Sequence, residues 1–157
     1  MKKKIIVDLD VVTVALWDKK GKNTDIAKRF LERIAKGEFY VATPFFLIET
    51  VLKWNYEALK QSIKNFYVRY SNKLFTDEEI KDTYENLDID YVKIIYELEN
   101  SGIKKEDAAL IFVASIFSFD YLVTFNRVHL KNKKEVANKI LKKWKLPSIE
   151  IVSPEEL

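Results

Sequence analysis

Two aspartates follow an apolar stretch at the start of the chain. Asp8 and Asp10 come directly after Ile5-Ile6-Val7. An unbroken run of β-branched residues predicts a strand buried on both faces, so Asp8 should lie where this strand leaves the sheet. If the chain stays extended, residues two apart point to the same side, and the two carboxylates would share one crevice. Adjacent carboxylates repel unless a proton or a cation such as Mg²⁺ lies between them. The alternative for Asp10 is that it caps the following turn.

Two further acids lie in segments with helical patterns. Glu49 falls in a helix that Thr43-Pro44 opens, with the proline expected in the first turn. Asp107 is at the start of the most apolar helix, expected from Ala108 to Phe119, where the helix dipole favours a carboxylate. Each also has an ordinary explanation, which is a surface helix position for Glu49 and an N-terminal helix charge for Asp107.

Asn126 ends a strand predicted at Tyr121–Phe125. In open parallel sheets, ligands bind at the carboxyl ends of the strands, so these polar side chains are expected to gather at that edge. The expected pocket offers oxygen ligands from Asp8, Glu49, Asp107 and Asn126. Such a pocket suits Mg²⁺ or Mn²⁺ and phosphoryl chemistry, in which the metal activates water and stabilises the charged phosphorus.

Composition excludes several other chemistries. The 157 residues include no Cys, which excludes disulfides, thiolate metal sites and Cys nucleophiles, and the single His129 argues against a zinc site or a serine-type triad. With 48% apolar residues and only three Gly and three Pro, the chain is expected to form one helix-rich domain, residues 1–157. No apolar run approaches the ~20 residues of a membrane span, and the basic start does not form a signal peptide, so a soluble cytoplasmic protein is expected.

The order of the elements predicts an α/β fold. A strand ending at Val7, a helix capped by Thr24 or Asn23, and a strand at Phe39–Ala42 form a βαβ unit, hence a parallel sheet with a right-handed crossover. The middle of the chain has only helical patterns, one of which starts with a capping box at Thr76–Glu79. The later expected elements are a basic helix over Asn132–Lys145 and a last strand over Ile149–Val152.

Taken in order, these motifs resemble the PIN domain. This is the fold of the toxin nucleases of bacterial and archaeal toxin–antitoxin pairs and of several RNA-processing endonucleases. Each motif is weak alone, and it is the ordered set, spread over the whole chain, that carries the resemblance. The matching segments are Ile6–Val12, Thr43-Pro44 with Glu49–Val51, Lys105–Leu110 leading into Ala114, Leu122–Leu130 and the tail Ile151–Leu157.

The resemblance implies a three-layer α/β/α sandwich with a central, mainly parallel sheet of about four to five strands. It also implies a metal-dependent endoribonuclease in which Asp8, Glu49 and Asp107 bind Mg²⁺ or Mn²⁺ and carry the catalysis. The family often has a fourth acid where this chain has Asn126, and usually a neutral polar residue where it has Asp10. Asn can still ligate a hard cation through its carbonyl oxygen, and Asp10 is inferred to restore part of the missing charge.

RNA is the expected substrate, and several residues are candidates for contacting it. Thr124 is expected to hydrogen-bond an acid or the substrate, unless it only fills a strand position. Arg127 is expected to hold a phosphate bidentately, with a surface salt bridge as the alternative, and His129 is expected to be structural. A lysine-rich run is either an RNA-backbone contact or the solvated face of a helix. It comprises Lys131, Lys133, Lys134, Lys139, Lys142, Lys143 and Lys145.

Two other functions remain open. An Asp-x-Asp motif after a buried strand also opens the haloacid-dehalogenase-type phosphatases, in which the first Asp is a covalent nucleophile and the second a general acid. The chain has no Gly-Asp pair for the metal motif of that family, and Glu49 would have no role. The other alternative is a PIN-like module that binds RNA or protein without cleaving. The expected partners are a second copy of the chain, paired through the helices between Glu49 and Leu98, and a small antitoxin protein.

Overall fold

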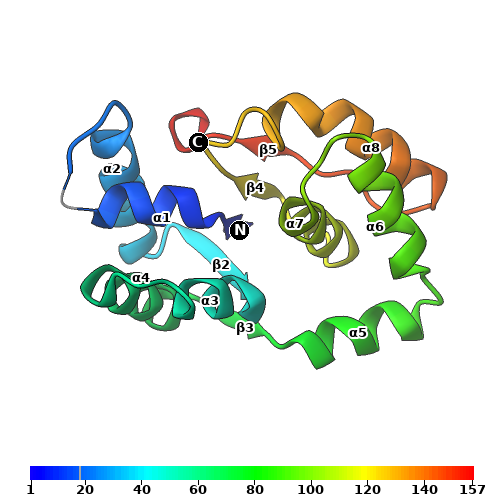
Figure 1. Ribbon diagram of the computed structural model, residues 1–157, viewed down its shortest axis with the longest axis horizontal. Helices are drawn as coiled ribbons and strands as arrows, with labels where there is room; N and C mark the ends of the chain where they lie inside the picture. Colours follow the sequence, from blue (N-terminus) through cyan, green and yellow to red (C-terminus); the bar gives the residue numbers. More distant parts are fainter. Residues whose placement is uncertain (18) are drawn as a thin grey trace.

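The computed structural model describes residues 1–17 and 19–157, which form a five-stranded sheet in the order β3-β2-β1-β4-β5. Each pair of neighbouring strands is parallel (Figure 1). The strands are β1 Lys3–Val7, β2 Phe39–Pro44, β3 Lys73–Phe75, β4 Tyr121–Val123 and β5 Ile151–Val152. The α-helices are α1 Leu9–Leu16, α2 Thr24–Ala35, α3 Phe45–Leu52, α4 Glu57–Tyr70, α5 Asp77–Asn86, α6 Tyr91–Asn100, α7 Lys105–Ile116 and α8 Lys134–Lys143. Two 3₁₀ turns, η1 Lys131–Lys133 and η2 Pro154–Glu156, complete the elements of the described chain.

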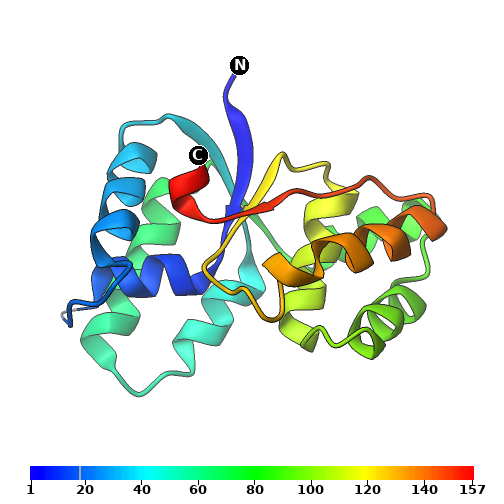
Figure 2. The same cartoon turned by 90° about the horizontal axis from the view of Figure 1, so that it is seen from above.

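Helices cover both faces of the sheet, and β1 explains why. Successive side chains of a strand point to opposite faces. Ile5 and Val7 pack with buried residues of α1, α2 and α4, whereas Ile6 packs with buried residues of α6, α7 and α8. All three side chains are completely buried. Figures 1 and 2 show the two groups of helices on either side of the sheet. The predicted three-layer α/β/α sandwich with a parallel central sheet is therefore confirmed.

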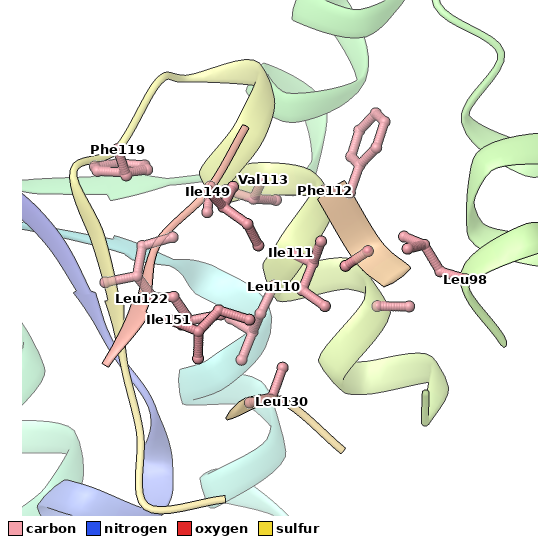
Figure 3. Close-up of a cluster of buried hydrophobic side chains, with 14 of the residues drawn as sticks. Leu98, Leu110, Ile111, Phe112, Val113, Phe119, Leu122, Leu130, Ile149 and Ile151 are labelled. Atoms are coloured by element: carbon pink, nitrogen blue, oxygen red, sulfur yellow. The ribbon is translucent and has the colours of Figure 1, made fainter. Parts of the chain in front are cut away.

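Helix α7 is the centre of the second helical layer. Five consecutive residues, Leu110–Ala114, are buried, so this helix has apolar neighbours on all sides. Leu122 of β4 and Ile151 of β5 belong to the same cluster, and Figure 3 shows them around the residues of α7. Because the core holds α7 from every side, its first turn is fixed relative to the sheet. Asp107 lies in that turn.

The first half of the fold follows the sequence prediction in β1, β2 and α2, but no helix was predicted at Leu9–Leu16, where α1 forms. Strands β1 and β2 pair in parallel, with Ile5 opposite Val41. Helix α2 lies between them in the chain, and its apolar stripe is buried as predicted. The capping box at the start of α5 is present, because Thr76 and Glu79 exchange hydrogen bonds.

Within residues 1–17 and 19–157, no helix combines the length and the apolar character that a membrane crossing requires.

One strand was not predicted. Residues Lys73–Phe75 form β3 and pair with β2, in a region where only helices were expected. This expectation is wrong because three residues are too few to show an alternating pattern, and all three are only partly buried at the edge of the sheet. Asn72 aligns β3 locally, since its side chain accepts from Val41 N–H and its own N–H donates to Val41 O.

Several predicted boundaries differ from those observed. The apolar helix starts at Lys105 rather than Ala108, and it ends at Ile116 because Ser118 takes a left-handed conformation with φ of 53°. Pro44 ends β2 and precedes α3, instead of lying in the first turn of that helix. The strands β4 and β5 are shorter than predicted, and a 3₁₀ turn replaces the start of the expected basic helix.

The core assignment predicts a large difference between two leucines of the same chain. Leu122 is completely buried in β4, whereas Leu87 at the end of α5 is 58% exposed. Leu122→Ala should lower the free energy of unfolding by about 2–5 kcal/mol, because it removes buried methyl groups and leaves a cavity. Leu87→Ala, the matched control, should change it by less than about 1 kcal/mol. Urea denaturation followed by circular dichroism measures both, and equal effects would contradict the assigned core.

Candidate functional site

Asp8 lies at the carboxyl end of β1 and caps the next helix. Its backbone N–H donates to Val123 O at 2.9 Å, which continues the ladder between β1 and β4. Its Oδ1 accepts from Leu9 N–H at 2.8 Å at the start of α1. The side chain is only 8% exposed. The expected position of Asp8, where the strand leaves the sheet, is therefore observed.

Asp10 reaches Asp8 by a different route from the one expected. It is the second residue of α1, so the chain is not extended between the two acids. Both carboxylates instead meet at Thr124, whose Oγ1 lies 2.9 Å from Asp8 Oδ2 and 3.2 Å from Asp10 Oδ2. Phe125 N–H also donates to Asp10 Oδ2 at 3.0 Å. The segment that follows β4 thus brings the two acids together.

The hydroxyl of Thr124 is committed to the two acids. Thr124 is completely buried, and its Oγ1 accepts from Asn126 N–H at 2.9 Å. Since the backbone donor occupies the acceptor side of this oxygen, its single proton is directed at the carboxylates. The structure therefore selects the acid-binding alternative for Thr124. Because Thr124 is completely buried in this structure, its predicted contact with substrate stays a prediction.

Asp107 joins this group through Asn126. Asp107 is the third residue of α7 and is 9% exposed. Asn126 Nδ2 donates to Asp107 Oδ2 at 3.3 Å, and Asn126 Oδ1 accepts from His129 N–H at 3.1 Å. The backbone N–H of His129 needs an acceptor, so the amide atom of Asn126 opposite it is Oδ1 and the one opposite Asp107 is Nδ2. In this conformation the amide nitrogen of Asn126 faces Asp107, whereas its carbonyl oxygen, the atom predicted to bind a cation, faces the backbone N–H of His129.

Burial raises the pKa values of all three aspartates, and the charge of Asp8 raises those of Asp10 and Asp107 further. Burial raises the pKa of Asp8 above its usual range. Burial, followed by the negative charge of Asp8, raises the pKa of Asp10 to about 7. The same two causes raise the pKa of Asp107 to about 6, with His129 acting in the opposite direction. The three carboxylates therefore resist sharing one region as anions unless protons or a cation accompany them.

No basic side chain of the described residues forms a direct ion pair with these acids, although the charges of His129 and Lys104 lower the pKa of Asp107. Among the ion pairs of residues 1–17 and 19–157, none involves Asp8, Asp10 or Asp107. The donors that surround these acids are a neutral hydroxyl, a neutral amide and backbone N–H groups. Buried carboxylate oxygens that lack a basic partner fit a hard divalent cation such as Mg²⁺ or Mn²⁺. Within residues 1–17 and 19–157, however, no three His, Cys, Asp or Glu side chains converge closely enough to hold a metal ion, so the ion that the PIN resemblance implies stays a prediction.

Glu49 and Arg127 lie outside this group. Glu49 is exposed on α3, and no hydrogen bond or ion pair of the described chain joins it to the three aspartates. Arg127 is exposed just after Asn126, and no ion pair in the described chain involves it. The structure thus brings together Asp8, Asp10, Asp107, Thr124 and Asn126. The roles predicted for Glu49 and Arg127 remain predictions.

The lysine-rich run is largely used within the fold. Lys131 pairs with Glu156, Lys134 with Glu150 at 3.1 Å and Lys143 with Glu97 at 2.5 Å. Lys133 Nζ donates to Ser101 O at 2.9 Å, at the end of α6. The remaining lysines of the run, Lys139, Lys142 and Lys145, are exposed. A surface for the RNA backbone would therefore depend on these three and not on the whole run.

One buried residue next to the site was not predicted from the sequence. Tyr67 of α4 is completely buried, and its hydroxyl donates to Val7 O at 2.7 Å, next to Asp8. In the sequence Tyr67 is one member of the apolar stripe of its helix, a position that indicates packing alone. A buried tyrosine needs a partner for its hydroxyl, and that requirement is the signal available in the sequence.

The class of fold has a counterpart among solved structures. The chain is similar to a chain of the crystal structure of VapBC2 from Rickettsia felis bound to a DNA fragment from their promoter. The TM-score is 0.58 at 16% sequence identity, over 96% of this chain and 98% of that chain. No family model matches the sequence, and no curated protein matches it. At this identity the likeness establishes a shared fold over nearly the full length.

The raised pKa of Asp10 predicts how the metal-free protein responds to pH. Because its pKa is about 7 in the folded chain and 3.8 ordinarily, the folded state binds the extra proton between these values. The contribution of Asp10 to stability is therefore present at low pH and is lost as the pH rises towards 7. In EDTA, the melting temperature of the wild type relative to Asp10→Asn should fall between pH 5 and pH 8.

The control for this measurement is Asp82→Asn, which changes an exposed aspartate of α5. Its melting temperature should follow that of the wild type throughout the pH range. Mn²⁺ added at pH 8 should raise the melting temperature of the wild type, because a cation that binds the folded state stabilises it. A wild type that gains stability relative to Asp10→Asn as the pH rises would contradict the assigned pKa.

Proposed function

We propose that this chain is a metal-dependent endoribonuclease of the PIN type. The observation that carries the proposal is the group of three buried aspartates, Asp8, Asp10 and Asp107, at the carboxyl edge of a parallel sheet. Burial raises the pKa of each, the charge of Asp8 raises those of Asp10 and Asp107 further, and no basic side chain of the described residues forms an ion pair with them. The sequence motifs that resemble the PIN domain and the fold shared with a VapBC2 chain support the same conclusion.

In this proposal Asp8, Asp10 and Asp107 hold Mg²⁺ or Mn²⁺. When bound, the metal would supply a nucleophilic water at neutral pH and stabilise negative charge on the phosphate. Thr124 keeps Asp8 and Asp10 oriented by its hydroxyl, and Asn126 orients Asp107 by its amide. In-line attack on a phosphodiester would leave a 5′-phosphate and a 3′-hydroxyl.

Two exposed residues complete the proposed site. Glu49 on α3, predicted together with Asp8 and Asp107 to bind the metal, remains a proposed ligand, since an exposed carboxylate can turn towards a metal and its substrate. Arg127 remains the proposed phosphate contact, because a guanidinium binds two phosphate oxygens at once and no ion pair of the described chain competes for it. RNA is the proposed substrate, and Lys139, Lys142 and Lys145 are the lysines available to its backbone.

A PIN-like module without activity is the second candidate. It is favoured by one observation, which is that the amide of Asn126 donates to Asp107 where a carboxylate would add a further ligand. Such a module would bind RNA or a protein through the same edge. The proposed partners of either form are a second copy of the chain and a small antitoxin protein. The similar VapBC2 chain, from a structure bound to a DNA fragment from their promoter, supports testing the antitoxin by co-purification.

The first prediction from this proposal concerns cleavage. The purified protein should cut single-stranded or structured RNA with Mg²⁺ or Mn²⁺ and should lose this activity in EDTA. Asp8→Asn and Asp107→Asn should each reduce the rate at least about a hundredfold, because each removes a charged ligand. Asp82→Asn on the surface of α5 is the control and should cleave normally. A wild type that binds Mn²⁺ but leaves varied RNAs intact would favour the inactive module.

The same assay measures the contribution of Asp10 to metal binding. A charge-assisted contact contributes roughly 1.5–3 kcal/mol, so Asp10→Asn should raise the Mn²⁺ concentration for half-maximal cleavage about tenfold to a hundredfold. Asn126→Asp should recover part of this loss in the double variant, because it restores a carboxylate beside Asp107. Unchanged metal dependence in Asp10→Asn would limit Asp10 to its hydrogen bonds with Thr124 and Phe125.

The proposed homodimer rests on exposed apolar side chains between Glu49 and Leu98. Val92 and Tyr96 lie one turn apart on α6 and are 74% and 64% exposed. Sedimentation at micromolar concentration should give twice the chain mass of 18.5 kDa. The variant with Val92→Glu and Tyr96→Glu should sediment as a monomer, whereas Val128→Glu, at an exposed apolar residue outside the span, should not. A monomeric wild type would contradict the dimer.

A further inference from the structure

The carbonyl oxygen of Val7 points towards β2 but has no backbone N–H of that strand as a donor. Asp8 N–H donates to β4, and because Val7 C=O and Asp8 N–H belong to one trans peptide, in which the two groups point in opposite directions, Val7 O points towards β2. The register pairs Ile5 with Val41, so the same register places Thr43 opposite Val7. The next backbone nitrogen of β2, which would donate to Val7 O, belongs to Pro44 and carries no hydrogen.

Tyr67 supplies the missing donor. Its hydroxyl lies 2.7 Å from Val7 O, and the residue is completely buried. It comes from α4, and the end of this helix is joined to β2 by two further contacts. Asn72 N–H donates to Val41 O at 2.7 Å, and the hydroxyls of Ser71 and Thr43 are 2.7 Å apart. The end of β1 is therefore held by β4 on one side and by α4 on the other.

The environment of the phenol keeps it a donor. Burial, followed by the negative charges of Asp8 and Asp10, raises the pKa of Tyr67 well above its usual range. The hydroxyl therefore stays protonated, and Val7 O is the acceptor for its proton. The effect of these two charges also indicates that the phenol lies near the acid group.

We propose that Tyr67 is a positioning residue of the metal site, which fixes the last peptide of β1 and through it the backbone and carboxylate of Asp8. The proposal rests on the proposed metal-dependent function. It follows from the combination of Pro44, which removes the ladder donor, and Tyr67, which replaces it from another layer of the fold. The backbone position of Asp8 matters because it sets the position of a carboxylate that caps α1 through Oδ1 and accepts from Thr124 through Oδ2.

The test compares Tyr67→Phe with a matched control. Ser115→Ala also removes one buried hydroxyl that donates to a backbone carbonyl, that of Pro147, and it lies eight residues beyond Asp107 on α7, about 12 Å away along the helix. Amide hydrogen exchange should accelerate about tenfold at Asp8 and Leu9 in Tyr67→Phe, because a lost hydrogen bond of this kind changes an equilibrium by about that factor. Ser115→Ala should leave these two amides unchanged.

The second readout is Mn²⁺ binding without RNA, measured by calorimetry. Tyr67→Phe should bind Mn²⁺ about threefold to tenfold more weakly than the wild type, while Ser115→Ala should bind it equally well. Adding Pro44→Ala to Tyr67→Phe should recover part of the binding and of the exchange protection, since alanine restores an N–H opposite Val7 O. Failure of this recovery would overturn the account based on Pro44.

The outcomes separate this inference from the proposed function. If the wild type does not bind Mn²⁺, the metal-dependent function fails, and hydrogen exchange at Asp8 and Leu9 still decides whether Tyr67 positions the end of β1. If exchange at these amides is the same in Tyr67→Phe and Ser115→Ala, the positioning role is overturned. If exchange accelerates but Mn²⁺ affinity stays equal to that of the wild type, the link from Tyr67 to the metal site is overturned.

Discussion

Repulsion among three buried carboxylates is the constraint on which the rest of the site depends. Asp8, Asp10 and Asp107 come from the end of β1, the first turn of α1 and the first turn of α7. Burial raises the pKa of each, and the charge of Asp8 raises those of the other two further. A fold keeps such a group only when other interactions hold its members in place. Here the parallel ladder and the apolar surroundings of α7 fix the backbones of the first and the third.

The segment after β4 compensates part of this repulsion with neutral donors. Thr124 gives its hydroxyl to Asp8 and Asp10, Phe125 gives its backbone N–H to Asp10, and Asn126 gives its amide to Asp107. The segment is itself anchored to the turn after α6, where His129 Nδ1 lies 3.2 Å from Gly102 O and Lys133 donates to Ser101 O. Asn126 therefore adds a donor to the group without adding a negative charge to it.

The architecture could be predicted from the sequence where the patterns are long. The apolar run of β1, the stripe of α2 and the apolar character of α7 are repeated features, and each appears in the structure as expected. Short features were missed or misplaced for a physical reason. β3 has three residues and little burial, and the start of α7 lies among charged residues, Lys105–Asp107, that carry no apolar period. Long-range packing, and not local preference, decides such boundaries.

The sequence by itself determined that Asp8 ends a buried strand, because a charged side chain cannot continue between two apolar layers. It also determined the ligand chemistry, since a chain without Cys and with one His can offer a metal little besides oxygen. Only the tertiary structure decided how the acids meet. Asp10 approaches Asp8 through Thr124, which is distant in sequence, and Asn126 turns its nitrogen to Asp107 because His129 N–H occupies its oxygen. These contacts join segments more than a hundred or about twenty residues apart, and the sheet order that juxtaposes them has no local signal.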